Sequence, residues 1–372
     1  MKKKKYTVAE SEIFSVNIAW GFILIFTLLA LAGLSFHFYD KIFNLEVDYS
    51  KSIAYARHAW ISASVARKQA GILSWSSALG HVLCNFYFIP IFLLLFSWEQ
   101  LISKAKYVLL FLNVFIMLIY ASTMGSRTIP FFFLCFFFGL ILLKCKTCPG
   151  KKIRSYVFLC LVVVLLVTSY NFYIFKLRVN AFGKKNVKYY SESFYAFLGG
   201  EKKKIEKVEK VENIFVKIYY YYELTSIYII HNHWTFAKVL EMEDYRKEMM
   251  FRYLWFPLER IGIKVPFNQT PSRTPGKFLS LPGSAYVTYG KRGMFIFAFI
   301  LGCFIGLAEI LVNIKKQSLG AAFFYVLVGI FVFSSFLTSA GSLLPFPFFC
   351  CAFFIFLISY KTFTKLKGRR YA

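Results

Sequence analysis

Long apolar runs separated by short polar segments dominate the chain. A helix needs roughly 20 apolar residues to cross a bilayer, or somewhat fewer where polar ends reach the headgroups. Eight segments meet or nearly meet this length, so the pattern predicts an all-α polytopic membrane protein with about eight transmembrane helices. The segments are Ile13–Phe36, Ile72–Phe96, Tyr107–Thr123, Ile129–Leu143, Ser155–Ile174, Gly293–Ile314, Leu319–Leu337 and Leu343–Tyr360.

Basic residues in the short connections predict the orientation of these helices, because Lys and Arg next to a span resist translocation. With a cytoplasmic N-terminus, the five cytoplasmic pieces carry 18 Lys and Arg but only three Glu, and an even span count makes the C-terminus cytoplasmic too. Glu309, near the cytoplasmic end of the sixth span, is expected to pair with Lys315 and Lys316. The five pieces are Met1–Glu12, Trp98–Lys106, Lys144–Arg154, Asn313–Ser318 and Lys361–Ala372.

Composition supports the membrane assignment and limits what the charge can mean. With 58% hydrophobic residues and a mean hydropathy of +0.56, the chain is too apolar for an ordinary soluble domain. A net charge of +27 would suggest nucleic-acid binding in a soluble protein. Here the lysines lie outside the spans, so we expect anionic membrane lipids or phosphorylated substrates as partners, and no nucleic acid.

Two longer segments are expected on the opposite, external side. The first, His37–Gly71, contains a predicted amphipathic stretch at Ala54–Lys68. The second, Asn171–Arg292, carries 21 Lys and Arg against 11 Asp and Glu, and long loops escape the charge rule that orients short ones. The chain is therefore expected to have three parts, namely a membrane bundle over 1–170, a large basic external loop with interfacial helices over 171–292, and a second membrane bundle over 293–372.

One stretch of the large loop, Ile214–Trp234, is aromatic and amphipathic but is interrupted by Lys217 and Glu223. This pattern favours a helix that lies in the outer membrane interface. The alternative is a ninth span, which would reverse the orientation of everything after it. The two histidines in this stretch, His231 and His233, are candidate general bases because imidazole titrates near neutral pH. At i,i+2 they do not share a helix face, and we expect neither a metal nor a cofactor.

The segment Ser122–Pro130 (STMGSRTIP) lies between two apolar runs, and its glycine and proline both disfavour regular helix. Non-helical backbone near a membrane is tolerated where it lines a polar cavity or is buried in protein. Arg127 is flanked here by the hydroxyls of Ser126 and Thr128. A helix is expected to begin near Ile129, and a guanidinium beside a helix N-terminus can bind phosphate. The alternative is a turn whose arginine contacts lipid headgroups.

The segment Asn268–Gly293 is rich in proline and glycine, which are expected to exclude helix and strand and to leave a structured loop leading into the sixth span. Its basic residues are Arg273, Lys277, Lys291 and Arg292. We expect them to converge at the outer membrane face, where paired arginines suit pyrophosphate. The alternative is that Lys291 and Arg292 only anchor the helix end among the headgroups.

Three features point to one family. They are Gly125–Thr128 (GSRT) at an outer span junction, the large basic loop late in the chain, and Tyr286–Gly293 (YVTYGKRG) leading into Gly302 and Gly306. Together they resemble the Wzy family of bacterial O-antigen or oligosaccharide repeat-unit polymerases. The resemblance implies a fold similar to GT-C-type lipid-linked glycosyltransferases in the bacterial inner membrane. It implies transfer of a growing glycan from undecaprenyl pyrophosphate to the next lipid-linked repeat unit at the periplasmic face.

By this resemblance, Arg127 and Arg273 would act as catalytic residues, with His231 or His233 as the base. The residues implied in pyrophosphate binding are Ser126, Thr128, Lys277, Lys291 and Arg292. A polysaccharide chain-length regulator is an expected partner. Two alternatives stay open, an O-antigen ligase and a flippase or other transporter of lipid-linked oligosaccharide. Transporters usually show repeated halves and polar spans, whereas these spans are rich in Phe and nearly uncharged.

Overall fold

The structure is a computed structural model that describes residues 16–50, 52–72, 74–147, 153–181, 213–241, 250–251, 279–314, 318–335 and 338–369. Within these residues all regular secondary structure is helical, which confirms the predicted all-α class. Six helical segments are long and apolar enough to cross a membrane. They are Ile18–Asn44, Trp75–Phe96, Ala105–Thr123, Thr128–Thr147, Leu281–Ile314 and Pro345–Leu366.

Most of the predicted apolar segments keep their approximate bounds in the structure. The helices are α1 (Val16–Tyr39), α2 (Ile53–Gln69), α3 (Trp75–Cys84), α4 (Phe88–Phe96), α5 (Ala105–Thr123), α6 (Thr128–Thr147), α7 (Ile153–Ala181), α9 (Ile214–Glu241), α11 (Leu281–Ile314), α12 (Leu319–Ser334) and α13 (Pro345–Arg369). The predicted spans that became α7 and α12 have shorter apolar stretches, Leu161–Ile174 and Leu319–Ser334. The count of eight spans therefore stays a prediction.

The span Trp75–Phe96 consists of two helices joined by a short 3-10 turn at Asn85–Tyr87. Pro90 explains the turn, because proline has no N–H to donate to the carbonyl four residues earlier and its ring crowds that carbonyl. This span is the most enclosed of the six, with 78% of its apolar window buried, against 11% for α11. It forms the centre of the bundle.

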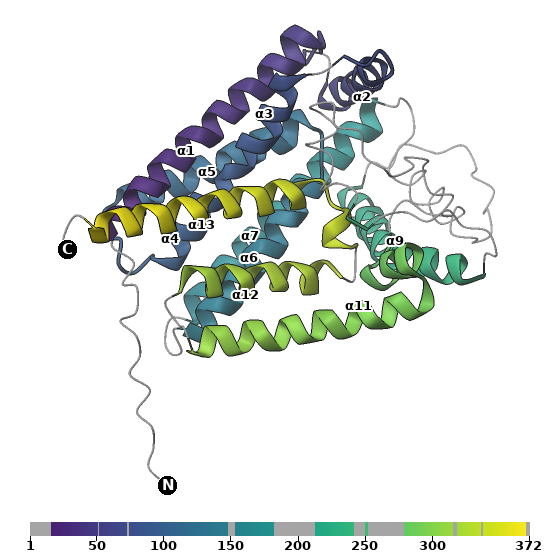
Figure 1. The fold of residues 1–372 in the computed structure, drawn as a ribbon. Coiled ribbons are helices and arrows are strands. Elements are labelled where there is room, and N and C mark those ends of the chain that lie inside the picture. The colour runs from purple at the N-terminus through teal and green to yellow at the C-terminus, as the bar shows by residue number, and fades with distance from the viewer. Residues whose placement is uncertain are drawn as a thin grey trace, which may run out of the picture.

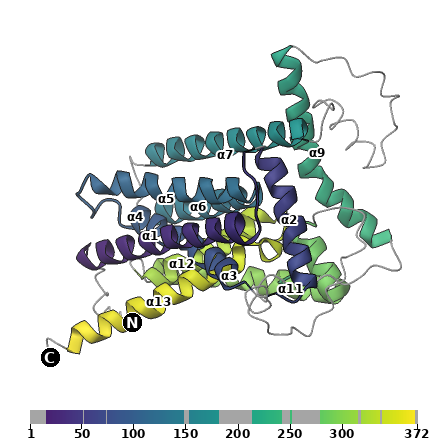
Figure 2. The ribbon, with the colours of Figure 1, turned by 90° about the horizontal axis from the view of Figure 1, so that it is seen from above.

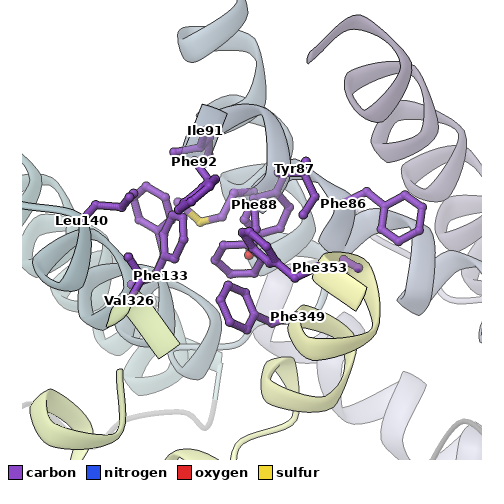
Figure 3. Packing of buried hydrophobic residues seen from close by; sticks show 14 of the residues in the cluster. Phe86, Tyr87, Phe88, Ile91, Phe92, Phe133, Leu140, Val326, Phe349 and Phe353 are labelled. Atoms are coloured by element: carbon purple, nitrogen blue, oxygen red, sulfur yellow. The ribbon is translucent and has the colours of Figure 1, made fainter. Parts of the chain in front are cut away.

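Aromatic side chains fill this centre. The ring of Phe88 lies 5.0 Å from the rings of Phe136 and Phe349, both at steep angles, and Phe323 stacks on Phe353 at 4.1 Å. Figure 3 shows such side chains converging from α4, α6, α12 and α13. Edge-to-face and offset-stacked pairs add to the free energy of burial, so these four helices are held together as one unit.

The two ends of this bundle differ in their connections. The start of α1 and the end of α13 lie at one end, together with the connection from α4 to α5 (Figures 1 and 2). We call this the short-loop end. Helices α2 and α9 lie across the opposite end, where α5 turns into α6 (Figure 2). We call this the α2 end.

At the short-loop end, basic side chains join neighbouring segments. Lys144 donates a hydrogen bond to the carbonyl of Phe96 at 2.6 Å, at the end of α4. Lys146 forms an ion pair with Glu309 of α11. Glu309 is therefore paired, as expected, and its partner among the described residues is Lys146. The partners proposed from the sequence, Lys315 and Lys316, lie outside the described residues. The ends of α4, α6, α11 and α13, which lead into four of these connections, lie at this end of the molecule.

Helix α11 begins at Leu281, so the prediction of an irregular segment as far as the sixth span is wrong from that residue onward. Pro282 is tolerated because the first turn of a helix has N–H groups without intrahelical partners. Ser280 caps this start, since its Oγ accepts a hydrogen bond from the N–H three residues later, at 3.4 Å. Gly290, with φ of 75°, breaks α11 into a short first part and a long, largely exposed second part.

The two helices expected outside the spans are present. The amphipathic stretch predicted at Ala54–Lys68 corresponds to α2, and the stretch predicted at Ile214–Trp234 lies within α9. Helix α9 is not among the six segments that could cross a membrane by length and composition. One of its faces is buried and packs on the first part of α11, through Val239 against Leu279 and Val287. Its predicted place in the membrane interface stays a prediction.

Candidate functional site

The α5–α6 turn, Thr123–Arg127, forms the centre of the candidate site at the α2 end. Gly125 has a φ of 51°, a conformation that glycine adopts at least cost. A Cβ atom on Gly125 would lie only 3.1 Å from Cδ of Arg57, so a larger residue here would require the Arg57 side chain to shift. The helix break predicted at this glycine is confirmed.

Three cationic side chains meet at this turn. Lys41 Nζ donates a hydrogen bond to the carbonyl of Thr123 at 2.9 Å. Arg57 Nη1 donates to the carbonyls of the next two residues at 2.8 and 3.0 Å. Arg127 belongs to the turn itself. The last carbonyls of α5 have no intrahelical donors and carry partial negative charge, so cations that bind them stabilise the end of the helix.

The positive charges at the turn act on one another. Burial, followed by the charge of Arg127, lowers the pKa of the Arg57 guanidinium from its usual value. Arg57 keeps its proton, because the guanidinium is effectively always charged in proteins. Lys41 is only 1% exposed and lies 4.0 Å from the centre of the Trp60 ring. An anion bound near these groups would relieve the repulsion, and water screens it poorly where the groups are buried.

The beginning of α6 adds to this positive environment. The helix begins at Thr128, one residue before the predicted start near Ile129. Ser126 Oγ accepts a hydrogen bond from the Thr128 N–H at 3.2 Å, so it serves the helix start. Tyr170 of α7 donates to the carbonyl of Ser126 at 3.4 Å and holds the turn from the other side. A helix N-terminus carries a partial positive charge that favours bound anions.

A pocket of about 310 Å³ opens beside the turn. Ser122 and Thr123 line it together with the apolar side chains of Phe115 and Ile119. Tyr49 closes one side and donates a hydrogen bond to the carbonyl of Thr123 at 3.2 Å. Burial raises the pKa of Tyr49, so its hydroxyl stays protonated and remains a donor. The turn therefore has open space next to it.

A π-helical turn at Asp40–Asn44, directly after α1, brings Lys41 to the site. Its neighbour Asp40 faces other elements, since Oδ1 accepts from Arg67 Nη1 of α2 at 2.8 Å and from Ser74 Oγ at 2.6 Å. The negative charge of Asp40 is thus engaged by Arg67, while the positive charge of Lys41 lies on the α5–α6 turn. Such π-turns recur at functional sites.

A buried polar network underlies the turn and links α1, α3 and α5. His37 Nε2 lies 3.1 Å from Thr123 Oγ1, and His81 Nδ1 lies 2.8 Å from Tyr120 Oη. The two imidazole rings are 5.2 Å apart between centres. Polar groups at membrane depth are expensive unless they are bonded to one another, so this network fixes the three helices and positions Thr123.

The other residues predicted from the sequence lie on α9, on α11 or outside the described residues. His231 is fully buried within α9, whereas His233 is exposed. Lys291 and Arg292 are exposed and follow the break at Gly290 in α11. Arg273 and Lys277 lie outside the described residues.

Sequence reasoning missed Lys41 and Arg57, the two cations that other elements bring to the turn. Lys41 follows a long apolar run with no Gly or Pro between them, which was a signal that the helix carries a charge into a packed region. Arg57 lies on an amphipathic helix, where an arginine normally faces headgroups or water. Only the packing of α2 over the end of α5 distinguishes the two cases.

Comparison with protein-family models, with curated protein sequences and with solved structures finds no match for this chain. In the part of the chain that the structure describes, no group of three or more His, Cys, Asp or Glu side chains could hold a metal ion. The arrangement at the α2 end therefore has to be interpreted from its own chemistry. Buried and partly buried cations around one turn, with a helix N-terminus beside them, give a positive environment that favours an anionic group.

Proposed function

We propose that the protein is a membrane glycosyltransferase that polymerises lipid-linked oligosaccharide repeat units, as its resemblance to the Wzy family implies. The observation that carries the proposal is the convergence of Lys41, Arg57 and Arg127 on one turn at one end of a helical bundle. A donor linked through pyrophosphate is an anion at the end of a long apolar chain. It matches a cationic site at the end of apolar helices.

The proposed chemistry is electrostatic. When the sugar leaves the donor, negative charge develops on the departing phosphate oxygen, and fixed positive groups stabilise that charge in the transition state. Arg127 would contact the pyrophosphate, and Arg57, which uses Nη1 to hold the turn, would contribute its charge alongside. Lys41 is too deeply buried to contact substrate and would raise the local positive potential.

The remaining parts of the proposal follow from topology. We propose eight spans, with the short-loop end in the cytoplasm and the α2 end at the periplasmic face of the bacterial inner membrane, because the short connections are basic. The external loop would supply Arg273, Lys277, Lys291 and Arg292 for the pyrophosphate. A base from this side would be His233, which is exposed, and not His231, which is buried.

Replacing Arg127 tests the proposal directly. Arg127→Ala, expressed at the normal level, is expected to remove long-chain polysaccharide from a gel of the surface glycan. Arg127→Lys is expected to restore part of it, because lysine keeps the charge but loses the bidentate geometry. Long-chain polysaccharide at the wild-type level in Arg127→Ala cells would overturn the proposed role of the site.

Deletion of the whole protein separates the polymerase from its alternatives. Cells without a polymerase keep caps of a single repeat unit on lipid A, whereas cells without an O-antigen ligase have no caps. Elongation of lipid-linked repeats by the purified protein in detergent would exclude a transporter, since detergent leaves no membrane to cross.

A further inference from the structure

A continuous depression runs between α1, α2 and α3, apart from the α5–α6 turn. One part is a groove of about 680 Å³ between α1 and α3, and the other part is a pocket of about 840 Å³ beneath α2. The two share Tyr39, Trp75 and Ser76 in their walls. One molecule can therefore occupy both parts.

The groove is apolar and lies on two segments that could cross a membrane. Phe36 of α1 and Leu79 of α3 line it, and both are about two-fifths exposed, at 40% and 41%. The small side chain of Ala32 leaves room between them. Such a groove is accessible from the side of the bilayer and fits a hydrocarbon chain.

The pocket beneath α2 has a mostly apolar wall with polar side chains in it, and Arg67 forms part of that wall. The side chain of Arg67 is 9% exposed, and its Nη1 binds Asp40 at 2.8 Å. Arg67 Nη2 is buried and has no hydrogen-bond partner among the described residues. A buried donor without a partner costs about 1–3 kcal/mol. Because Nη2 is not accessible from the pocket, a ligand with an oxygen acceptor would remove this cost only after the Arg67 side chain moves.

The charges around the pocket have no cationic excess, unlike those at the α5–α6 turn. The charge of Arg67 is already matched by Asp40, and the pocket wall also contains the carboxylate of Glu46. Glu46 has φ of 51° and is the only non-glycine residue with positive φ in the described part of the chain. Strained backbone of this kind is kept where it positions a functional group. A second anion would be repelled here, whereas uncharged hydroxyls would find both donors and acceptors.

Further groups favour a hydroxyl-rich ligand. Asn44 donates to Ser76 Oγ at 2.9 Å, and both line the pocket. The rings of Tyr39 and Trp75 are 52% and 61% exposed at the junction of groove and pocket. An amphipathic aromatic ring at this level offers an apolar face to the carbon side of a sugar and a polar edge to water.

We propose that this depression binds one bilayer lipid with an uncharged, sugar-bearing head, with a chain in the α1–α3 groove and the sugar beneath α2. The site goes beyond the proposed polymerase function and does not depend on it. It is also chemically distinct from the anion site, because it holds one matched charge pair and a further carboxylate in place of surplus cations.

The test uses quenching of tryptophan fluorescence by lipids with brominated chains. The purified protein is placed in vesicles with small fractions of brominated monoglucosyl diacylglycerol, phosphatidylglycerol or phosphatidylethanolamine. We expect that only the sugar lipid gives quenching that saturates at a low fraction of brominated lipid.

Two tryptophan variants locate the quenched residue. Trp75→Phe should remove this saturating component, and Trp98→Phe, at the short-loop end, should keep it. Equal quenching by the three lipids, saturation with a phospholipid, or persistence in Trp75→Phe would overturn the proposal.

A second variant tests the head pocket separately. Asn44→Ala should raise the half-saturating fraction of the sugar lipid about threefold or more, since one hydrogen bond is lost. Phe111→Ala, on the exposed face of α5, should leave it unchanged. An unchanged half-saturation in Asn44→Ala would overturn the placement of the sugar. Arg127→Ala should bind the lipid normally, so failure of the polymerase proposal and failure of this one give different results.

Discussion

Both ends of the helical bundle use basic side chains to bind carbonyl oxygens where helices end, but they differ in how many positive charges gather at one turn. At the short-loop end, Lys144 and Lys106 donate to the carbonyls of Phe96 and Trp98, at 2.6 and 3.0 Å. At the α2 end, Lys41, Arg57 and Arg127 all belong to or contact one turn of five residues. Helix capping accounts for the two lysines at the short-loop end and for Lys41 and Arg57 at the α2 end, whereas Arg127 adds a third positive charge there, which a bound anion would explain.

The largest expected difference between the ends comes from removing one capping cation at each. Arg57→Ala loses two charged hydrogen bonds and should lower the free energy of unfolding by about 2–3 kcal/mol and also abolish long-chain glycan. Lys144→Ala loses one such bond and should lower stability by about 1.5–3 kcal/mol while glycan length stays normal. Unfolding of the purified variants and a gel of the surface glycan check both. Shortened glycan in folded Lys144→Ala would erase the distinction between the two ends.

A smaller effect is expected from the backbone of the turn. Gly125→Ala combines positive φ with a 3.1 Å approach to Arg57 and should cost about 1–3 kcal/mol of stability and reduce glycan length. The control is Gly21→Ala, because Gly21 lies within α1 with open space where its Cβ would be. That change should stabilise the helix by about 0.5–1 kcal/mol. If the two variants unfold alike, the turn does not require glycine.

The smallest effect should come from Lys106→Ala at the short-loop end. Lys106 donates to the carbonyl of Trp98 and lies 4.6 Å from the centre of its ring, but it is partly exposed. Its removal should cost no more than about 1 kcal/mol and leave the glycan unchanged. A glycan defect in this variant would mean that the short-loop end also takes part in the reaction.

Hydrophobic pattern was enough to predict most helices of this fold, because spans need long apolar runs and leave few other solutions. It also located the α5–α6 turn, where Gly125 lies between two such runs. The prediction of an irregular segment was wrong at Pro282, because a proline indicates a helix break unless its position in the first turn of a helix is known.

The candidate site was only partly predictable, for a different reason. Arg127 could be found from its own neighbours in sequence. Lys41 and Arg57 reach the same turn through tertiary packing, and nothing in the local sequence of α2 distinguishes an arginine that binds a helix end from one that faces headgroups. Distances between segments that are far apart in sequence decide such cases.

The π-helical turn at Asp40–Asn44 has a consequence for how the two proposed sites are related. Asp40 holds Arg67 in the wall of the lipid pocket, and Lys41 holds the turn that carries Arg127. Because these two residues are consecutive, a single peptide unit connects the wall of the pocket with the α5–α6 turn. Deletion of one residue within this π-helical turn would therefore displace two contacts at once, that of Asp40 with Arg67 and that of Lys41 with the carbonyl of Thr123.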